Sequence, residues 1–403
     1  MWQTKRAQRL LFTVVTLLFW TSMYVYVPTL SPYLSSRGLS LQLIGIVLGS
    51  YGFIQMLIRF PLGMTSDRLG IRKPFILIGM IAACMSCLLF LIPGYWLWPL
   101  AGRAMAGLCA STWVAFTVMY AYANYYDASD VTKAMGHISV MTVMGQMIGM
   151  LISGWADQTL GAAAPFLIGA VLAAVGLLFA FKLKESTDAQ HERAGISLAK
   201  VRDVIRTRTL LQVSLLSVLA HGVLFITMFG FTPLKAEALG ANGLEMTALV
   251  FAFMLPHAIA SLFTAKWFAP KFGIWFTIGI GFLFSTLCTI AICYVSSMGV
   301  LIMTQAINGF AQGLHIPLLL GLAIRDVEPS GRATAMGLYQ AVYAVGMFSG
   351  PFLAGWLNES WGLNSGFAFG GMLGFIAVGL CVVWHRNDRK RKQQQEGYHT
   401  AAQ

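Results

Sequence analysis

Long apolar runs alternate with short polar turns along the whole chain, and this pattern leaves few folds open. Charged residues make up only 10% of the 403 residues and hydrophobic residues 57%. A soluble domain has about 25% charged residues, whereas one membrane-spanning helix needs about 20 apolar residues. Spanning barrel strands would instead alternate polar and apolar residues over about ten positions. The pattern therefore predicts an all-α polytopic membrane protein.

Twelve membrane-spanning helices account for the apolar runs. We expect them near residues 9–35, 41–62, 74–94, 97–124, 131–155, 162–184, 209–234, 244–265, 273–294, 297–324, 332–357 and 364–385. The first run is too long for a signal-peptide core and lacks a small-residue cleavage pattern, so we keep it as a mature helix. The longest polar segment follows span six. We therefore divide the chain into a first six-helix bundle (1–185), a cytoplasmic linker (186–208), a second bundle (209–385) and a disordered cytoplasmic tail (386–403).

The distribution of basic residues predicts the orientation of these spans. With the N-terminus in the cytoplasm, 23 of the 27 basic residues lie on that side, in agreement with the positive-inside rule. Only Arg37 and Lys235 fall in outer loops, and Arg59 and Arg103 lie inside spans. The net charge of +12 is thus explained by topology and attraction to anionic lipid, and nucleic acid is not expected as a partner.

An internal repeat divides the chain into two similar halves. Gly145 and Gly149 of span five recur as Gly346 and Gly350 of span eleven, shifted by 201 positions. Glycines at such spacing let helix backbones approach closely. Two six-helix halves of the same orientation are typical of parallel-repeat transporters, which place their site between the halves. We therefore expect two pseudo-symmetric bundles with a central site.

A charged, glycine-bounded elbow joins spans two and three. Its marked positions are Gly63, Asp67, Arg68, Gly70, Arg72 and Lys73. These positions resemble the loop signature of the major facilitator superfamily. Arg103 followed by Gly107 resembles that family's intramembrane arginine motif, and the glycine ladder of span five resembles the motif of its drug:proton antiporter branch. This ladder departs from the motif because Met150 replaces a proline, and a proline occurs instead in the second half as Pro351.

We expect a monomer with both termini in the cytoplasm, and the resemblance implies a proton-coupled secondary transporter of the bacterial cytoplasmic membrane. It also implies a latch in which Asp67 meets the N-terminus of span eleven, near Gly331 and Arg332. A carboxylate there would complement the helix dipole by about 0.3–2 kcal/mol. The alternative is that the elbow is a solvated loop that only sets the orientation.

The interior of the membrane region is cationic or neutral in this sequence. None of the 15 acidic residues falls in the middle of a span, whereas Arg103 and Arg59 do lie in spans. A buried arginine costs about 2.5–3.5 kcal/mol on insertion scales, so it usually has a partner or a function. We expect Arg103 to face the central cavity, although carbonyls and tyrosines could hold it as structure. Arg59 is interpreted as structural, tied to the elbow or to span four.

Three histidines lie in separate spans of the second half: His221, His257 and His315. Histidine titrates near neutral pH, so these residues are candidate proton carriers, and the alternative is that each is a satisfied core residue. Further candidates for polar or aromatic cavity contacts are Tyr24, Gln55, Trp113, Gln312 and Gln340.

These features predict export of a small anionic or zwitterionic organic solute against proton entry. In a looser way, residues 325–356 are similar to bacterial exporters of opine-type metallophores, which implies a polycarboxylate substrate. The alternatives are a multidrug efflux antiporter, an uptake symporter, and a non-transporting receptor or scaffold. The sequence has no GxxxxGK[ST] loop for a nucleotide, no metal-ligand cluster and no Ser-His-Asp spacing. We therefore expect no cofactor, no metal site and no catalytic residue.

Overall fold

The computed structural model describes residues 4–122, 131–185, 207–325, 327 and 332–401, and within these ranges the regular elements are helices joined by short turns. The first half comprises α1 (Lys5–Tyr24), α2 (Leu30–Ser36), α3 (Leu41–Leu69), α4 (Lys73–Leu91), α5 (Leu97–Ser111), α6 (Trp113–Tyr122), α7 (Val131–Leu160) and α8 (Ala164–Ala180). The second half comprises α10 (Arg208–Ile226), η2 (Thr227–Phe231), α11 (Thr232–Ala238), α12 (Gly243–Phe263), η3 (Thr264–Phe268), α13 (Ala269–Phe272), α14 (Ile274–Ala291), η4 (Ile292–Tyr294), α15 (Met298–Arg325), α16 (Arg332–Trp361) and α17 (Asn364–Ala401).

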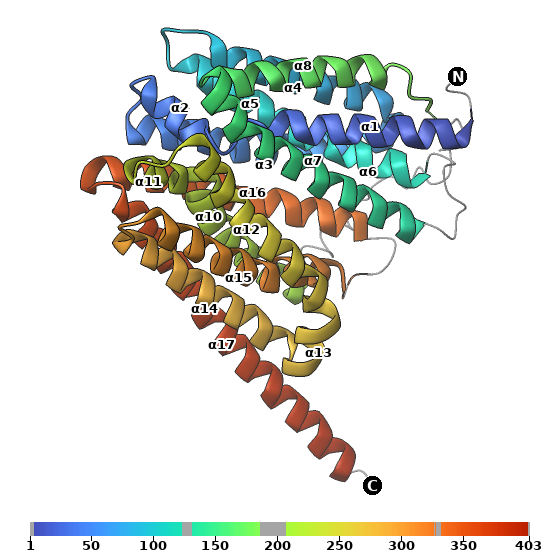
Figure 1. The fold of residues 1–403 in the computed structure, drawn as a ribbon. Helices are drawn as coiled ribbons and strands as arrows, with labels where there is room; N and C mark the ends of the chain where they lie inside the picture. The colour runs from blue at the N-terminus through green and yellow to red at the C-terminus, as the bar shows by residue number, and fades with distance from the viewer. Residues whose placement is uncertain (1–3, 123–130, 186–206, 326, 328–331, 402–403) are drawn as a thin grey trace.

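These helices supply the twelve predicted spans. Eight stretches in the described residues are long and apolar enough to cross a membrane: α3, α4, α7, α10 with α11, α12, α14 with η4, α15 and α17. The other four spans correspond to α1 with α2, α5 with α6, the shorter apolar α8, and α16. Figure 1 shows the two halves one above the other, with α2 and α11 at one end and the start of α1 at the opposite end.

The glycine ladders pack equivalent helices together in the two halves. A methyl group on Gly149 of α7 would lie 2.7 Å from the carbonyl oxygen of Thr21 on α1. One on Gly346 of α16 would lie 2.0 Å from the carbonyl oxygen of Val218 on α10. Only glycine permits backbones this close. The repeat of 201 positions therefore has the same packing role twice.

The first and seventh spans are both interrupted near the end that carries α2 and α11. α1 ends at Tyr24 and α2 starts at Leu30, with Pro28 in the intervening turn. In the seventh span, the π-helical η2 separates α10 from α11, and Pro233 lies in the first turn of α11. Proline cannot continue a helix ladder without losing a hydrogen bond, and π-helical turns often occur at functional sites.

The two halves contact each other most closely at this α2–α11 end. A methyl group on Gly154 of α7 would lie 1.8 Å from the carbonyl oxygen of Gly243 on α12, and one on Gly45 of α3 would lie 2.4 Å from that of Pro351 on α16. The amide of Leu244 also donates to the side chain of Gln158 at 3.3 Å. Backbone approaches of this kind close that end of the interface.

The elbow differs from the expected loop. Residues 63–69 continue α3 as helix, and the turn itself is short, with Gly70 in the left-handed region at φ +67°. The backbone amides of Arg72 and Lys73 donate to the carboxylate of Glu185, and the Lys73 ammonium donates to the Phe181 carbonyl at 2.8 Å. The elbow is therefore held by the end of α8, within its own half.

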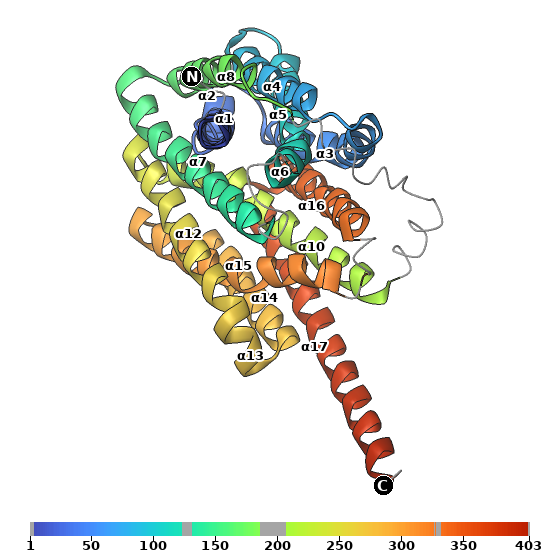
Figure 2. The same ribbon diagram turned by 90° about the vertical axis from the view of Figure 1, so that its right-hand side faces the viewer.

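Two sequence-based expectations fall on residues that the structure does not describe, and a third is wrong. The side chains of Asp67 and Arg332, together with Gly331, lie outside what the structure describes, so the latch stays a prediction. The same holds for most of the 186–208 linker. The expectation of disorder after Arg386 is wrong for residues up to Ala401, which continue α17 as helix and project away from the bundle (Figures 1 and 2).

Candidate functional site

One face of α3 carries Tyr51, Gln55 and Arg59 toward the boundary between the halves. Residues four apart on a helix lie one above the other, so these three side chains form a single row. All three are buried, and Arg59 is only 6% exposed. Figures 1 and 2 place α3 beside α16 of the second half, and these two helices pack against each other extensively. The row therefore lies where the two halves meet.

Arg103 on α5 lies over the first residue of this row. Its guanidinium carbon is 4.4 Å from the centre of the Tyr51 ring, and the side chain is 3% exposed. Within the described part of the chain, its Nε has no hydrogen-bond partner. Gly107 makes the approach possible, since a methyl group there would lie 2.6 Å from the Tyr51 carbonyl oxygen. A desolvated cation–π contact of this kind is worth about 2 kcal/mol. The arginine motif thus places a buried positive charge on an aromatic face.

The Tyr51 ring connects this charge to the second half. Its ring centre is 5.9 Å from that of Phe225 on α10, with the planes inclined by 19°. The charge of Arg103 also acts on Tyr24 and Tyr26. No salt bridge to Arg103 occurs among the residues that the structure describes, so tyrosine rings and hydroxyls form its described surroundings.

Arg59 makes a second contact across the boundary. Its Nη1 donates to Gln55 Oε1 and to the hydroxyl of Tyr343 on α16, each at 3.0 Å, and its Nη2 donates to the Ala110 carbonyl at 3.4 Å. The Tyr343 ring stacks on His221 of α10, with ring centres 4.1 Å apart and planes within 4°. One hydrogen bond and one ring stack thus connect a cation of the first half to a histidine of the second.

His221 is in turn fixed by its own half. Its Nδ1 lies 2.8 Å from the Ser217 carbonyl oxygen, one turn earlier on α10, and the Ser217 hydroxyl is hydrogen-bonded to the hydroxyl of Tyr339. Such a neighbour fixes which ring nitrogen carries the proton. We name the set Arg59, Gln55, Tyr343 and His221 the cross-half cluster.

An aromatic wall adjoins these charges on the side of α1. Trp20 packs edge-to-face against Trp113 with ring centres 4.9 Å apart, and Tyr24 contacts Phe229 of η2 at 6.1 Å. Tyr24 and Trp113 are half-buried, and no described residue accepts a hydrogen bond from Trp20 Nε1. The wall therefore offers ring faces and one unpaired donor from the two interrupted spans and α6.

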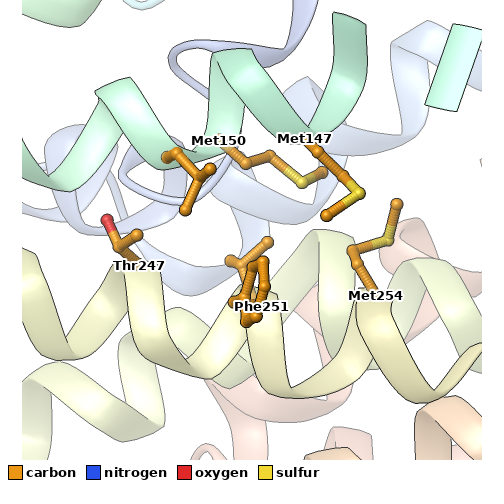
Figure 3. Close-up of a pocket in the computed structure, with 7 residues that line it drawn as sticks. Met147, Met150, Thr247, Phe251 and Met254 are labelled. Carbon is orange, nitrogen blue, oxygen red and sulfur yellow. The ribbon is translucent and has the colours of Figure 1, made fainter. Parts of the chain in front are cut away.

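A small methionine-rich pocket lies between α7 and α12. Figure 3 shows Met147 and Met150 of α7 opposite Thr247, Phe251 and Met254 of α12. Methionine side chains are flexible and adapt to irregular apolar partners. This second boundary between the halves is therefore apolar, in contrast to the charged boundary between α3 and α16.

A buried polar stripe runs along α15 inside the second half. Its members Gln305, Asn308, Gln312 and His315 share one helix face and are all 0% exposed. Ser285 of α14 donates to Asn308 Oδ1 at 2.7 Å and accepts from Gln312 Nε2 at 3.2 Å. The stripe thus faces α14, and Gln312 lies within the second half rather than at the boundary where we expected it.

Several polar atoms of the stripe have no hydrogen-bond partner among the residues that the structure describes. These are both amide atoms of Gln305, Nδ2 of Asn308, Oε1 of Gln312 and both ring nitrogens of His315. An unsatisfied buried polar atom costs about 1–3 kcal/mol, and buried waters usually satisfy such groups. His257 on α12, whose Nδ1 also lacks a partner, is close enough for its charge to act on His315.

The structure thus separates the predicted site residues into two groups. Arg103, Gln55 and His221 gather at the boundary, joined by Arg59, with Tyr24 and Trp113 in the adjacent aromatic wall. His257, His315 and Gln312 lie within the second half, and Gln340 is half-buried on α16. In the described residues, no group of three or more His, Cys, Asp or Glu side chains could hold a metal.

Sequence reasoning missed Tyr51, Tyr343 and Phe225. Tyr51 precedes Gln55 by one helical turn, so the spacing of the row was a usable signal. Tyr343 and Phe225 carry no such signal, since their role depends on which helix of the other half lies opposite. Arg59 was expected to contact span four, and its bond to Ala110 is of that kind, but its contact with the other half was not expected.

Known proteins share both the sequence pattern and the fold. The family model described as Major Facilitator Superfamily matches residues 12–236 and 213–401. The inner membrane transport protein YajR of Escherichia coli (strain K12) is 28% identical over 90% of this chain and 79% of its own. The class B tetracycline resistance protein of Escherichia coli is 25% identical over 77% of each chain. The crystal structure of the nucleoside transporter NupG (D323A mutant) superposes with a TM-score of 0.80 at 14% identity, over 93% of this chain and 99% of that one.

The family match extends over nearly the whole chain, and the solved structure shares its arrangement of helices. The protein is therefore a multi-pass membrane transporter, not an enzyme, and its fold is the twelve-helix, two-bundle fold predicted from the sequence. Its small-molecule substrate follows from the same assignment. The chain belongs to the Major Facilitator Superfamily.

Proposed function

We propose that this transporter exports a small anionic or zwitterionic organic solute in exchange for protons. The observation that carries the proposal is the buried Arg103, which rests on the Tyr51 ring at 4.4 Å and has no carboxylate partner in the described residues. A charge-assisted hydrogen bond to a solute carboxylate would supply about 1.5–3 kcal/mol. A lipophilic cation would meet only positive charge at this position.

The cross-half cluster is our candidate for coupling. A proton on His221 would place a second positive charge beside Tyr343, close to Arg59, and like charges at this separation repel. Protonation would therefore weaken the contact between the halves at α3 and α16. In this scheme the two halves rock about the central site. The charge on the cross-half cluster determines whether α3 and α16 are together or separated.

The polar stripe is the proposed route for the proton within the second half. Its unpartnered atoms favour bound waters, and histidines at neutral pH can accept and release protons. His257 and His315 would exchange protons along this stripe. Asp67 and the elbow would latch the cytoplasmic side, with both termini in the cytoplasm, as charge distribution and family resemblance suggest.

We favour export over uptake because one relative is named for resistance to tetracycline, and removal of a compound from the cell is one route to resistance. A polycarboxylate chelator such as an opine-type metallophore is one solute that fits the arginine. Symport would arise if the anion binds while the histidine is protonated, because the two opposite charges attract. Symport moves protons in the same direction as the solute and antiport in the opposite direction, so measuring both fluxes distinguishes them.

A multidrug efflux antiporter is the second candidate. The observations that favour it are the aromatic wall around Trp20 and Trp113 and the methionine-rich boundary of Figure 3. Flexible methionines and ring faces accept apolar bodies of many shapes. Such an exporter would transport amphipathic solutes whatever the state of Arg103.

Proton-driven flux in proteoliposomes tests the main proposal. A polycarboxylate amino-acid chelator and a lipophilic cation are offered to the wild type, Arg103→Gln, Arg103→Lys and the control Arg208→Gln, whose side chain is exposed. We expect Arg103→Gln to lose chelator flux about tenfold or more, Arg103→Lys to retain part of it, and the control to match the wild type. If the wild type transports the cation and Arg103→Gln transports it equally well, the multidrug function is established instead.

A further inference from the structure

A phenylalanine-lined groove lies on the second half, away from the site between the halves. Its lining includes Phe268, Phe272, Phe276, Phe284 and Phe310, and it encloses about 340 Å³. Figures 1 and 2 place α13 and α14 at the outer edge of this half. Phe272, Phe276, Phe284 and Phe310 are exposed, so the groove opens toward the lipid phase.

The groove runs along the first part of α14 and is long enough for a segment of a lipid acyl chain. From Phe276 to Phe284, both on α14, the chain advances eight residues, which corresponds to about 12 Å at the rise of a helix. Phe268 contacts Phe310 edge-to-face with ring centres 6.1 Å apart, and Phe272 lies 6.1 Å from Phe276. The rings therefore form a continuous apolar wall that reaches well into the membrane from one end.

Positive charge gathers at that end of the groove. The Lys271 ammonium lies 5.4 Å from the Phe272 ring centre and 5.8 Å from that of Trp267, and Lys266 is exposed one residue before Trp267. Trp267 is 67% exposed, and exposed tryptophans typically mark the membrane–water interface. The two lysines and the tryptophan thus occupy headgroup depth, while the phenylalanines occupy acyl-chain depth.

We propose that this groove binds one anionic phospholipid, with an acyl chain along the phenylalanine wall and the headgroup phosphate between Lys266 and Lys271. Both features are needed for the assignment, since an apolar wall alone accepts any lipid chain. The lysines add a preference for lipids of net negative charge. The site does not depend on the nature or the direction of the transported solute.

Native mass spectrometry of the full-length protein in detergent tests the proposal. Phosphatidylglycerol and phosphatidylcholine with identical acyl chains are added in equal amounts. We expect one phosphatidylglycerol to be retained per protein, with a preference over phosphatidylcholine that falls about fivefold for each lysine replaced in Lys266→Gln and Lys271→Gln. The matched control Lys235→Gln removes one positive charge near the opposite end of the second half and keeps the preference.

A second variant tests the acyl-chain part of the site. Ile280→Trp fills the groove from its half-buried wall and leaves both lysines in place. We expect it to lower retention of both lipids while the unfolding temperature without added lipid stays unchanged. Equal retention of the two lipids by the wild type overturns the proposal. So does an unchanged preference in the double lysine variant, or displacement of the retained lipid by the transported solute.

Discussion

Replacing Tyr343 by phenylalanine removes one hydroxyl from the contact between the halves and keeps the ring that stacks on His221. That hydroxyl accepts a hydrogen bond from the buried Arg59 guanidinium at 3.0 Å. A hydrogen bond to a charged group is worth about 1.5–3 kcal/mol. If the contact exists only while α3 and α16 are together, Tyr343→Phe shifts the equilibrium toward the separated state by about tenfold to a hundredfold.

The same α16 helix offers a matched control. Tyr339 lies one turn earlier, and its hydroxyl bonds Ser217 within the second half. Tyr339→Phe therefore makes the same chemical change without touching the boundary. It should lower the unfolding temperature somewhat and leave the distribution of states unchanged.

Pulsed electron paramagnetic resonance measures the effect through spin labels at Leu69 and Pro270, which are exposed on opposite halves. Arg59→Gln, Tyr343→Phe and the double variant complete a mutant cycle. We expect the longer-distance population to grow in both single variants and a coupling energy of about 1 kcal/mol or more. The reasoning is refuted if the two changes add within about 0.5 kcal/mol and the distance distributions of the single variants match the wild type.

Three further predictions follow from other parts of the structure. Gly154→Val should abolish turnover without preventing membrane insertion, because its Cβ would lie 1.8 Å from the Gly243 carbonyl oxygen. Flux and membrane yield are measured together, and full flux contradicts the prediction. Gln305→Leu should leave the unfolding temperature equal or higher, since neither amide atom has a hydrogen-bond partner among the described residues and the change therefore breaks no hydrogen bond within the described protein. A large fall in the unfolding temperature would contradict this. Glu185→Gln should lower the free energy of unfolding by about 1–2 kcal/mol, because it weakens the acceptor for the Lys73 amide. This would appear as a lower unfolding temperature. An unchanged unfolding temperature would mean that the elbow does not need this hydrogen bond.

The spans and the repeat were predictable because the membrane leaves a helix few alternatives. With no water available, backbone groups must be satisfied within the segment, so apolar runs translate directly into helices. The glycine spacing likewise predicted close helix contacts, and the structure shows that α1 and α10 are the neighbours of α7 and α16 there. The elbow was less predictable, because residues 63–69 are polar enough to read as a loop but remain helical as the end of α3.

The site was predictable only where one helix determines it. The row Tyr51, Gln55 and Arg59 follows from helical spacing alone. Gln312 shows the limit, because its spacing groups it with Asn308 and His315 but does not say which neighbouring helix that face meets. The stripe faces α14 through Ser285, and only the packing of three helices determines this. The same reason hid the contact between Arg59 and Tyr343.

The contacts along α3 indicate how solute binding affects the separation of the two halves. Near the α2–α11 end, α3 meets α16 through glycine backbones such as Gly45 against Pro351, with no charged group to satisfy. Farther along, Arg103 over Tyr51 and Arg59 on Tyr343 hold the same helix through guanidinium groups. Separating the halves at the glycines costs packing alone, whereas separating them at Arg59 leaves a buried cation with fewer partners. A solute carboxylate is the group that offsets this cost, so an anion at the guanidinium groups would ease the transition, and a cation would oppose it.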